Sequence, residues 1–465
     1  MRVLAVDFGT SNTVAMVRGA DGRARPLLFD GAPLLPSAVY LHPEGRLLVG
    51  RDAERSARMD PGRFEPNPKR RVDDGVLLLG DRELAVSDVI AAVLRHVAAE
   101  AHRQLGGVDE LRMTHPARWG DQRRQLLVAA ARAARLPIPR LVAEPVAAAS
   151  YYTAVLGSAV AQGRALAVYD LGAGTFDASV VRRTQGGFDV LAEQGLADLG
   201  GLDFDQALVE HLGRGYSETR TQIWNTLVSP ADAGSRRQRA LLYDDVRGAK
   251  EMLSRTTRAD VHLPTLDISA HVTREELESL IRPLLARTVS CLARTVAAAR
   301  LAPTELVGIF LVGGSSRIPL AAHLIHTELG VAPTTLEQPE TVVVEGALCF
   351  GAPVGTTARG HSGVPRPVAG PAPAPVPHPR VAAAAPPGPR PPVQHPRPVQ
   401  HPPPQRYAPP ISGAPVSPVA APPGGPHPVA APGKSWYEEP LAAWTAALGV
   451  MVLIAVAVLI AVAPR

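Results

Sequence analysis

The sequence YDLGAGTFDASVV, residues 169–181, decides the expected fold of this chain. An apolar run ends near Asp170, a turn rich in glycine and threonine follows, and Asp177 lies at the start of a second apolar run. The same plan occurs about 160 residues earlier in LAVDFGTSNTVAMV, residues 4–17. Each turn alone is weak evidence, since Asp and Gly are ordinary turn residues. Two such hairpins facing each other would grip one phosphate chain from both sides, so the pair predicts two related halves.

Strand-like and helical patterns alternate along residues 1–352 and predict an α/β fold with largely parallel strands. The glycine turn at 172–174 is expected to join two strands rather than open a helix, unlike a dinucleotide-binding turn. Strands are expected at 3–9, 37–41, 76–79, 111–117, 164–172, 176–181, 188–194 and 308–314. Long helices are expected at 86–105, 120–136 and 274–301.

The net charge of +5 belongs to the C-terminal region. Eight of the 48 Lys and Arg residues follow residue 353, but only two of the 43 acidic residues do. The preceding part is therefore nearly neutral, and charge gives no reason to expect a nucleic-acid partner.

Composition changes abruptly after residue 352. Residues 353–435 are rich in proline and alanine and are expected to form a disordered linker with polyproline II character. Such a segment is a spacer or, alternatively, a docking site for a partner that reads PxxP motifs. Residues 441–463 form an uncharged run of 23 residues, and at about 1.5 Å per residue they would cross a bilayer. We expect a single-pass, tail-anchored membrane protein.

The residues of the two turns suit phosphate and a divalent cation. Glycine lets backbone N–H groups approach phosphate oxygens, and hydroxyl groups can donate further hydrogen bonds. Asp7 and Asp170 cannot contact phosphate directly, but they can hold a hydrated Mg²⁺ that does. The loop LVGGSSRIP, residues 311–319, would accept a nucleoside or phosphate or form an ordinary β–α turn. The expected phosphate-binding residues of the turns are Gly9, Thr10, Ser11, Gly172, Gly174 and Thr175.

In order through residues 1–352, these motifs resemble the ATPase domain of the 70-kilodalton heat-shock chaperones, the DnaK-type family. VDFGTSNT and YDLGAGTFD are similar to the two phosphate loops of that family, and LVGGSSRIP is similar to its adenosine loop. NPKRR, residues 67–71, contains the counterpart of the catalytic lysine, and LVAEPVAAASYY, residues 141–152, resembles the helix that crosses between the lobes. Further similar segments are THPARWGDQRRQ at 114–125, LGGLDFD at 199–205 and QPETVVVEGAL at 338–348.

The resemblance implies a two-lobed, actin-like (ribonuclease H-like) α/β fold with MgATP or MgADP in the cleft. The lobes would span about 1–165 and 166–352. Lys69 would stabilise charge on the γ-phosphate and orient the attacking water. Asp7, Asp170 and Glu144 would hold the metal mainly through water, and Asp177 would organise Mg²⁺ and water together with Asp7 and Asp170. The implied catalytic residues are Asp7, Lys69, Glu144, Asp170, Thr175 and Asp177. The implied nucleotide-binding residues are Gly9, Thr10, Ser11, Asn12, Gly172, Ala173, Gly174, Gly200, Gly201, Lys250, Ser254, Gly313, Gly314, Ser315, Arg317 and Glu340.

Some positions depart from the family pattern. Ala173 stands where the family has a glycine, and a requirement for positive φ there would strain the loop. Glu251 stands where the family has a stacking arginine, and Arg247 where it has a glutamate. The peptide-binding domain that follows in the family has no counterpart after residue 352, so classical refolding of client proteins is not expected.

We therefore expect a membrane-anchored protein that hydrolyses ATP slowly and whose nucleotide state signals to an unidentified protein partner. The need for ATP places the ATPase domain in the cytoplasm. Ala173 and the altered helix leave open a nucleotide sensor or scaffold that binds ATP without turnover. A third alternative is another actin-like ATPase, either a filament former at the membrane or a sugar kinase.

Overall fold

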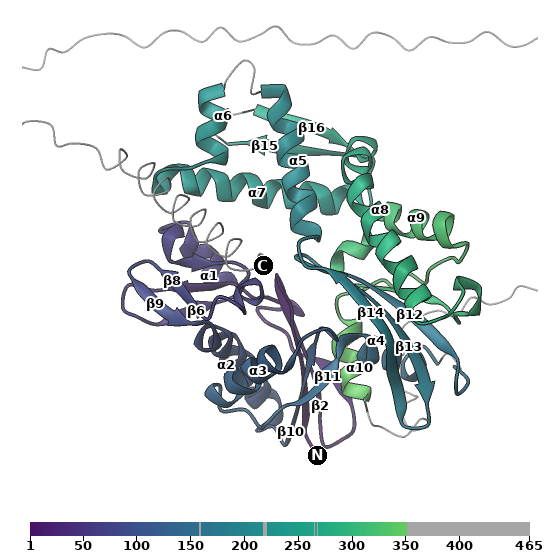
Figure 1. Cartoon of the computed structure of the whole chain (residues 1–465). Coiled ribbons are helices and arrows are strands. Elements are labelled where there is room, and N and C mark those ends of the chain that lie inside the picture. The colour runs from purple at the N-terminus through teal and green to yellow at the C-terminus, as the bar shows by residue number, and fades with distance from the viewer. Residues whose placement is uncertain (158–159, 217–220, 265, 267, 351–465) are drawn as a thin grey trace, which may run out of the picture. The chain divides into compact units, whose positions relative to one another are not determined.

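The computed structural model describes residues 1–157, 160–216, 221–264, 266 and 268–350. All of them lie in one compact unit (Figure 1). The predicted linker at 353–435 and the predicted membrane span at 441–463 lie outside the described residues. In the part of the chain that the structure describes, no helix is both long and apolar enough to cross a membrane.

The first lobe, residues 3–143, is built on a six-stranded sheet with strand order β11-β10-β1-β2-β3, in which β4 also pairs with β2. Small two- and three-stranded sheets and helix α1 add an outer part to this lobe. The strands of the main sheet are β1 (Val3–Phe8), β2 (Asn12–Arg18), β3 (Ala24–Pro26), β4 (Leu34–Pro36), β10 (Glu110–His115) and β11 (Arg140–Ala143). The outer strands are β5 (Val39–Leu41), β6 (Leu47–Val49), β7 (Phe64–Glu65), β8 (Val76–Leu79) and β9 (Arg82–Ala85). The helices are α1 (Arg51–Ala57), η1 (Pro61–Arg63), η2 (Pro68–Arg71), α2 (Val86–Leu105) and α3 (Asp121–Ala133).

The second lobe, residues 165–329, is built on a four-stranded sheet with strand order β14-β13-β12-β17. Its strands are β12 (Ala165–Leu171), β13 (Phe176–Thr184), β14 (Gly187–Leu196) and β17 (Ile309–Val312), and a separate hairpin pairs β15 (Arg258–Leu263) with β16 (Ile268–Thr273). Its helices are α5 (Gly201–Tyr216), α6 (Thr221–Val228), α7 (Ala233–Leu253), α8 (Arg274–Ala298), η3 (Pro303–Glu305), η4 (Gly314–Arg317) and α9 (Pro319–Leu329).

Two helices, α4 (Glu144–Ala154) and α10 (Val342–Cys349), lie between the two sheets and pack against each other (Figure 1). Side chains alternate across a strand, so each sheet can bury both faces. In β1, Leu4 and Val6 pack with α2 and α3, while Val3 and Ala5 join the core around α4 and α10. β12 repeats this division, with Leu166 facing the shared core. The two halves are therefore joined through one central helical layer.

The expectation of largely parallel strands is wrong. Only β1–β10, β10–β11 and β12–β17 pair in parallel among the described strands, and the other pairs are antiparallel. The reason is local, because each glycine turn closes a hairpin directly, and a direct short turn can only join antiparallel neighbours. The helix at 86–105 and the strand at 76–79 are confirmed at their predicted bounds.

Candidate functional site

A large cleft of about 740 Å³ lies between the lobes. Its walls contain both glycine turns, the beginning of α4, one face of α7 and the loop at 313–319. The predicted site residues that line it are Asp7, Gly9, Thr10, Ser11, Asn12, Lys69, Glu144, Asp170, Gly172, Ala173, Thr175, Asp177, Gly201, Lys250, Ser254, Gly313, Gly314, Ser315, Arg317 and Glu340. The structure thus brings together segments that are up to 333 residues apart in the chain.

Two predicted glycines, Gly174 and Gly200, lie behind the lining rather than in it. A Cβ atom at Gly174 would lie 2.8 Å from the Thr10 side chain of the other turn. A Cβ atom at Gly200 would lie 2.6 Å from the backbone of Ala173. Both glycines let neighbouring loops approach closely, so their role in the structure is packing of the loops.

The two turns are tight hairpins that leave an acid at the end of each first strand. Asp7 pairs with Val14 in the β1–β2 hairpin, and Asp170 pairs with Asp177 in the β12–β13 hairpin. The backbone N–H of Gly172 donates to the Thr175 carbonyl across the second turn at 3.1 Å.

Ala173 does not strain this loop. Among the described residues, positive φ in non-glycine residues occurs only at Asp30, Arg135 and Arg300. The φ at position 173 therefore does not require glycine, and alanine there carries no penalty from the left-handed conformation.

Lys69 and Glu144 form a nearly buried ion pair in the floor of the cleft. The Lys69 Nζ donates to Glu144 Oε1 at 3.1 Å, and the two side chains are 14% and 10% exposed. Lys69 lies in the short helix η2, and Glu144 is the first residue of α4. Burial alone would lower the pKa of Lys69, but the carboxylates of Glu144, Asp7 and Asp170 outweigh it and the pKa is raised. Lys69 is therefore held in its charged form beside the phosphate turns.

Around this lysine the cleft carries an excess of buried carboxylates. Burial raises the pKa of Asp170 well above its usual range, and the charges of Glu144, Asp177 and Asp7 raise it further. Burial likewise raises the pKa of Glu144 to about 7, against the opposing effect of Lys69. Such a site favours an added cation, because a divalent ion would relieve the repulsion among the carboxylates.

The donor set fits Mg²⁺, which takes oxygen ligands and retains several waters. Among the described residues, no three acidic, histidine or cysteine side chains converge closely enough to enclose a metal ion by themselves. Asp7, Asp170 and Glu144 remain the predicted residues for holding the ion mainly through its waters.

The far end of the cleft is lined by α7 and by the loop at 313–319. The Lys250 Nζ lies 2.6 Å from Asp205 Oδ1 and donates to the Gly201 carbonyl at 2.8 Å. Arg317 pairs with Glu340 at 2.7 Å. These contacts join α7 to α5 and the loop at 313–319 to the segment before α10, and leave a polar surface facing the cleft. The departures Arg247 and Glu251 also line this end.

Several residues of the site were not predicted as site residues. The Thr114 hydroxyl donates to Asp7 Oδ1 at 2.6 Å, because β10 runs beside β1. The Arg118 Nε donates to Asp177 Oδ1 at 2.5 Å. Asp205, the partner of Lys250, is 1% exposed. The sequence signals for these residues are weak, since each contact joins segments at least 45 residues apart.

Comparison with known proteins agrees with this geometry. The family model described as Hsp70 protein matches residues 75–357. The chain is 35% identical to a chaperone protein HscA of Pectobacterium carotovorum, over 74% of this chain and 57% of the relative. It is 32% identical to a chaperone protein DnaK of Thermotoga petrophila, over 74% of this chain and 58% of that relative. The chain thus spans somewhat more than half the length of these relatives. We conclude that it belongs to the Hsp70 family, and that its described part has the family's actin-like α/β fold.

Proposed function

We propose that the protein binds ATP with Mg²⁺ in the cleft between its lobes and hydrolyses it slowly. The observation that carries this proposal is the meeting of two glycine turns around the Lys69–Glu144 pair. One turn from each lobe contributes hydroxyl residues to the lining of the cleft, Thr10 and Ser11 from the first and Thr175 from the second, and Lys69 supplies a positive charge. Membership of the Hsp70 family supports the same reading.

The reaction proposed is in-line attack of water on the γ-phosphate, where catalysis depends on positioning and electrostatics. Lys69 would stabilise the negative charge that spreads over the transferred phosphoryl group. Asp177 would accept a hydrogen bond from the attacking water and so orient it. Thr10, Ser11 and Thr175 would bind phosphate oxygens. When bound, Mg²⁺ would neutralise phosphate charge among the carboxylates.

A test of this proposal uses the purified full-length protein. We expect Mg²⁺-dependent phosphate release that is lost in Lys69→Ala, while Arg25→Ala retains it. Arg25 is a suitable control because its ion pair with Asp21 is exposed on the first lobe and outside the cleft. Wild-type release no faster than that of Lys69→Ala would refute hydrolysis.

The second candidate function is a sensor or scaffold that binds nucleotide without turnover. The charges of Arg247 and Glu251 at the far end of the cleft favour it, since they reverse the family pattern there. Calorimetry with ATP beside a phosphate-release assay separates the two functions. Binding without phosphate release would support the sensor, and release would exclude it.

We further propose that the protein is tethered to a membrane by residues 441–463, with residues before them in the cytoplasm. The uncharged length of that segment supports this proposal. Nucleotide-driven movement of the lobes would then act on a protein partner, through a lobe surface or through the proline-rich segment. Retention in membranes after alkaline carbonate washing, and release when 441–463 are deleted, would support the tether. Recovery of the intact protein in the wash would refute it.

A further inference from the structure

An ion pair crosses from one lobe to the other at Asp177, the residue proposed above to orient the attacking water. Arg118 lies in the first lobe, in the segment between β10 and α3, and Asp177 lies on β13 of the second lobe. The Nε of Arg118 is 2.5 Å from Asp177 Oδ1, and the two side chains are 27% and 15% exposed. The other carboxylate oxygen, Oδ2, accepts from the Thr175 hydroxyl at 3.3 Å. Both oxygens of Asp177 therefore have donors, one from each lobe.

The sheet leaves room for this pair at one glycine. Gly195 on β14 lies opposite Asp177 in the antiparallel register. A Cβ atom at Gly195 would lie 2.7 Å from Asp177 Oδ1 and 3.1 Å from Arg118 Nε. Its φ lies outside the left-handed region, so backbone conformation does not require glycine here. Glycine is required here because a Cβ would crowd the carboxylate, the guanidinium and the Phe176 carbonyl oxygen, which would lie 2.8 Å away.

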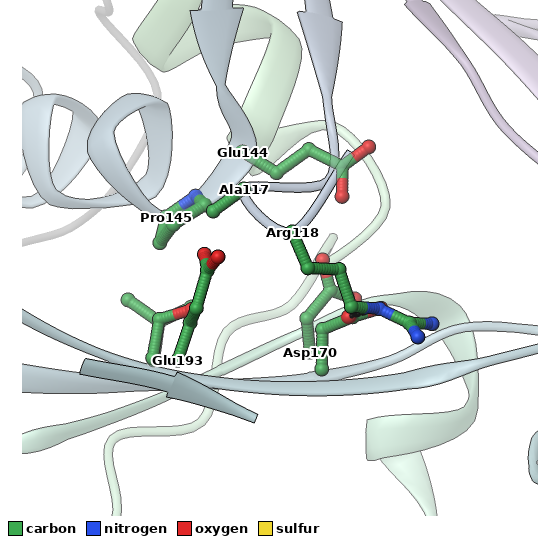
Figure 2. Close-up of a pocket in the computed structure, with 9 residues that line it drawn as sticks. Ala117, Arg118, Glu144, Pro145, Asp170 and Glu193 are labelled. Carbon is green, nitrogen blue, oxygen red and sulfur yellow. Dashed lines mark hydrogen bonds and ion pairs between the residues drawn. The ribbon is translucent and has the colours of Figure 1, made fainter. Parts of the chain in front are cut away.

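The pair borders a small cavity of about 10 Å³ (Figure 2), which shares Glu144, Asp170 and Asp177 with the lining of the main cleft. This volume is close to that needed for one water molecule. Figure 2 shows Glu144, Asp170 and Glu193 around it, with Arg118 extending from the segment beside Ala117. Arg118 is the only basic residue that lines this cavity in the described part of the chain. It therefore adds a positive charge among the four carboxylates there, of which Glu144 is also paired with Lys69 from the main cleft.

We propose that Arg118 is a positioning residue that holds the Asp177 carboxylate in the orientation needed to align the attacking water. The inference rests on the proposed hydrolysis of ATP. Arg118 donates to the Oδ1 edge, so Oδ2, beside Thr175, faces the phosphate turn and remains able to accept from water. Because the two residues belong to different lobes, the alignment depends on how the lobes are set against each other. The guanidinium of an arginine presents a rigid, planar set of donors, which suits a fixed carboxylate geometry.

The test measures steady-state ATP hydrolysis by full-length variants. We expect Arg118→Ala to lower kcat by about 10- to 100-fold, as small misplacements of catalytic groups do. KM for ATP should change by less than about threefold, because the substrate contacts are intact. Arg118→Lys should restore part of the rate, since it returns the charge without the planar donor. Arg25→Ala, which removes an exposed arginine of the same lobe, should behave as the wild type.

A second variant, in β14, tests the same ion pair by crowding Asp177. Gly195→Ala should also lower kcat, because its methyl group would lie 2.7 Å from Asp177 Oδ1. The methyl group would also lie 2.8 Å from the Phe176 carbonyl oxygen, so the stability of this variant is measured as well. If both substitutions act through the position of Asp177, the double variant should be no slower than the slower single variant. Circular dichroism and thermal unfolding show whether each variant is folded. If Arg118→Ala is not folded, the kcat of Arg118→Lys is compared with that of the wild type instead.

The outcomes separate this inference from the proposed function. A wild type that hydrolyses ATP with Arg118→Ala within about twofold of its kcat would overturn the inference alone. A loss confined to KM would also overturn it. A wild type without turnover would overturn the proposed hydrolysis and this inference together.

Discussion

The acidic residues of the two turns could be predicted as site residues because the same strand–turn–strand pattern occurs twice in the sequence. Asp7 and Asp170 end corresponding strands, and the structure places both in one cleft. The partners that fix these acids, Thr114 for Asp7 and Arg118 for Asp177, could not be predicted from local pattern. Their contacts arise only when β10 pairs with β1 and when the lobes meet. A threonine in a strand and an arginine in a loop are too common to indicate such roles.

The backbone conformations of Ala173 and Gly313 differ, and this difference can be tested by substitution. Ala173 lies outside the positive-φ region, whereas Gly313 has φ 81° and a Cβ there would lie 2.5 Å from the Leu171 carbonyl oxygen. We expect Ala173→Gly to lower the free energy of unfolding by only about 0.4–1 kcal/mol and to leave turnover nearly unchanged. Gly313→Ala should lower it by about 1–3 kcal/mol and weaken ATP binding. Urea unfolding measures the stability of each variant and calorimetry measures its ATP binding. Equal effects of the two substitutions would contradict the conclusion that position 313, unlike position 173, requires glycine.

Helices and strands followed from hydrophobic period, but their pairing did not. The 20 residues of α2 were predicted at both ends, because its apolar face is continuous and Gly106 ends it in the left-handed conformation. The direction of strand pairing was misjudged, since an alternating α/β pattern does not reveal that the glycine turns close hairpins. The central layer of α4 and α10 was expected from the resemblance alone, as neither short apolar segment has a distinctive period.

The crossing of α4 and α10 requires a glycine. A Cβ atom at Gly346 would lie 1.8 Å from the Ala147 carbonyl oxygen, so the helices must separate if one is added. We expect Gly346→Ala to lower the free energy of unfolding by about 1–3 kcal/mol through overpacking. Gly248, which is exposed in α7 with no atom near its Cβ position, is the control. Gly248→Ala should keep or slightly raise stability. A Gly346→Ala protein as stable as the control would contradict the close crossing.

The C-terminal end of α10 is held by arginines from the first sheet. Arg112 donates to the carbonyls of Ala347, Leu348 and Phe350, and Arg18 donates to that of Leu348. Burial raises the pKa of the Cys349 thiol at this end, so little reactive thiolate is present near neutral pH.

We expect slow alkylation of Cys349 at pH 8 and a rate that rises above pH 9. In Arg112→Ala we expect faster alkylation, because exposure of the freed end of α10 to solvent outweighs the loss of the Arg112 charge, which lowers the pKa of the thiol. Mass spectrometry with iodoacetamide measures the rate and assigns it to Cys349. Cys291, which is 1% exposed, serves as an internal reference that stays unreactive. Unchanged labelling of Cys349 in Arg112→Ala would show that the arginine does not hold this end.

At the scale of the whole molecule, ligand binding should tie the lobes together. The cleft is lined by residues of both lobes, so a nucleotide that contacts both turns stabilises the native state by mass action. At a ligand concentration of 100 times Kd the gain is about 2.7 kcal/mol. Thermal unfolding should therefore shift upward with ATP and Mg²⁺.

The shift should be much smaller with ATP and EDTA, since the carboxylates Asp7, Glu144, Asp170 and Asp177 then face the phosphates without a cation. Equal shifts with Mg²⁺ and with EDTA would contradict the metal-dependent site.

Two related halves were predicted from the repeated hairpin. How closely their turns approach, as Thr10 does Gly174, required coordinates.

The most direct test of the account is phosphate release by the full-length protein with ATP, in the presence and absence of Mg²⁺, beside Lys69→Ala. The account predicts slow release that requires Mg²⁺ and falls to background in the variant, while Arg25→Ala matches the wild type. Release that is independent of Mg²⁺, or equal in wild type and Lys69→Ala, would contradict the assignment of the interlobe cleft as an ATP-hydrolysing site.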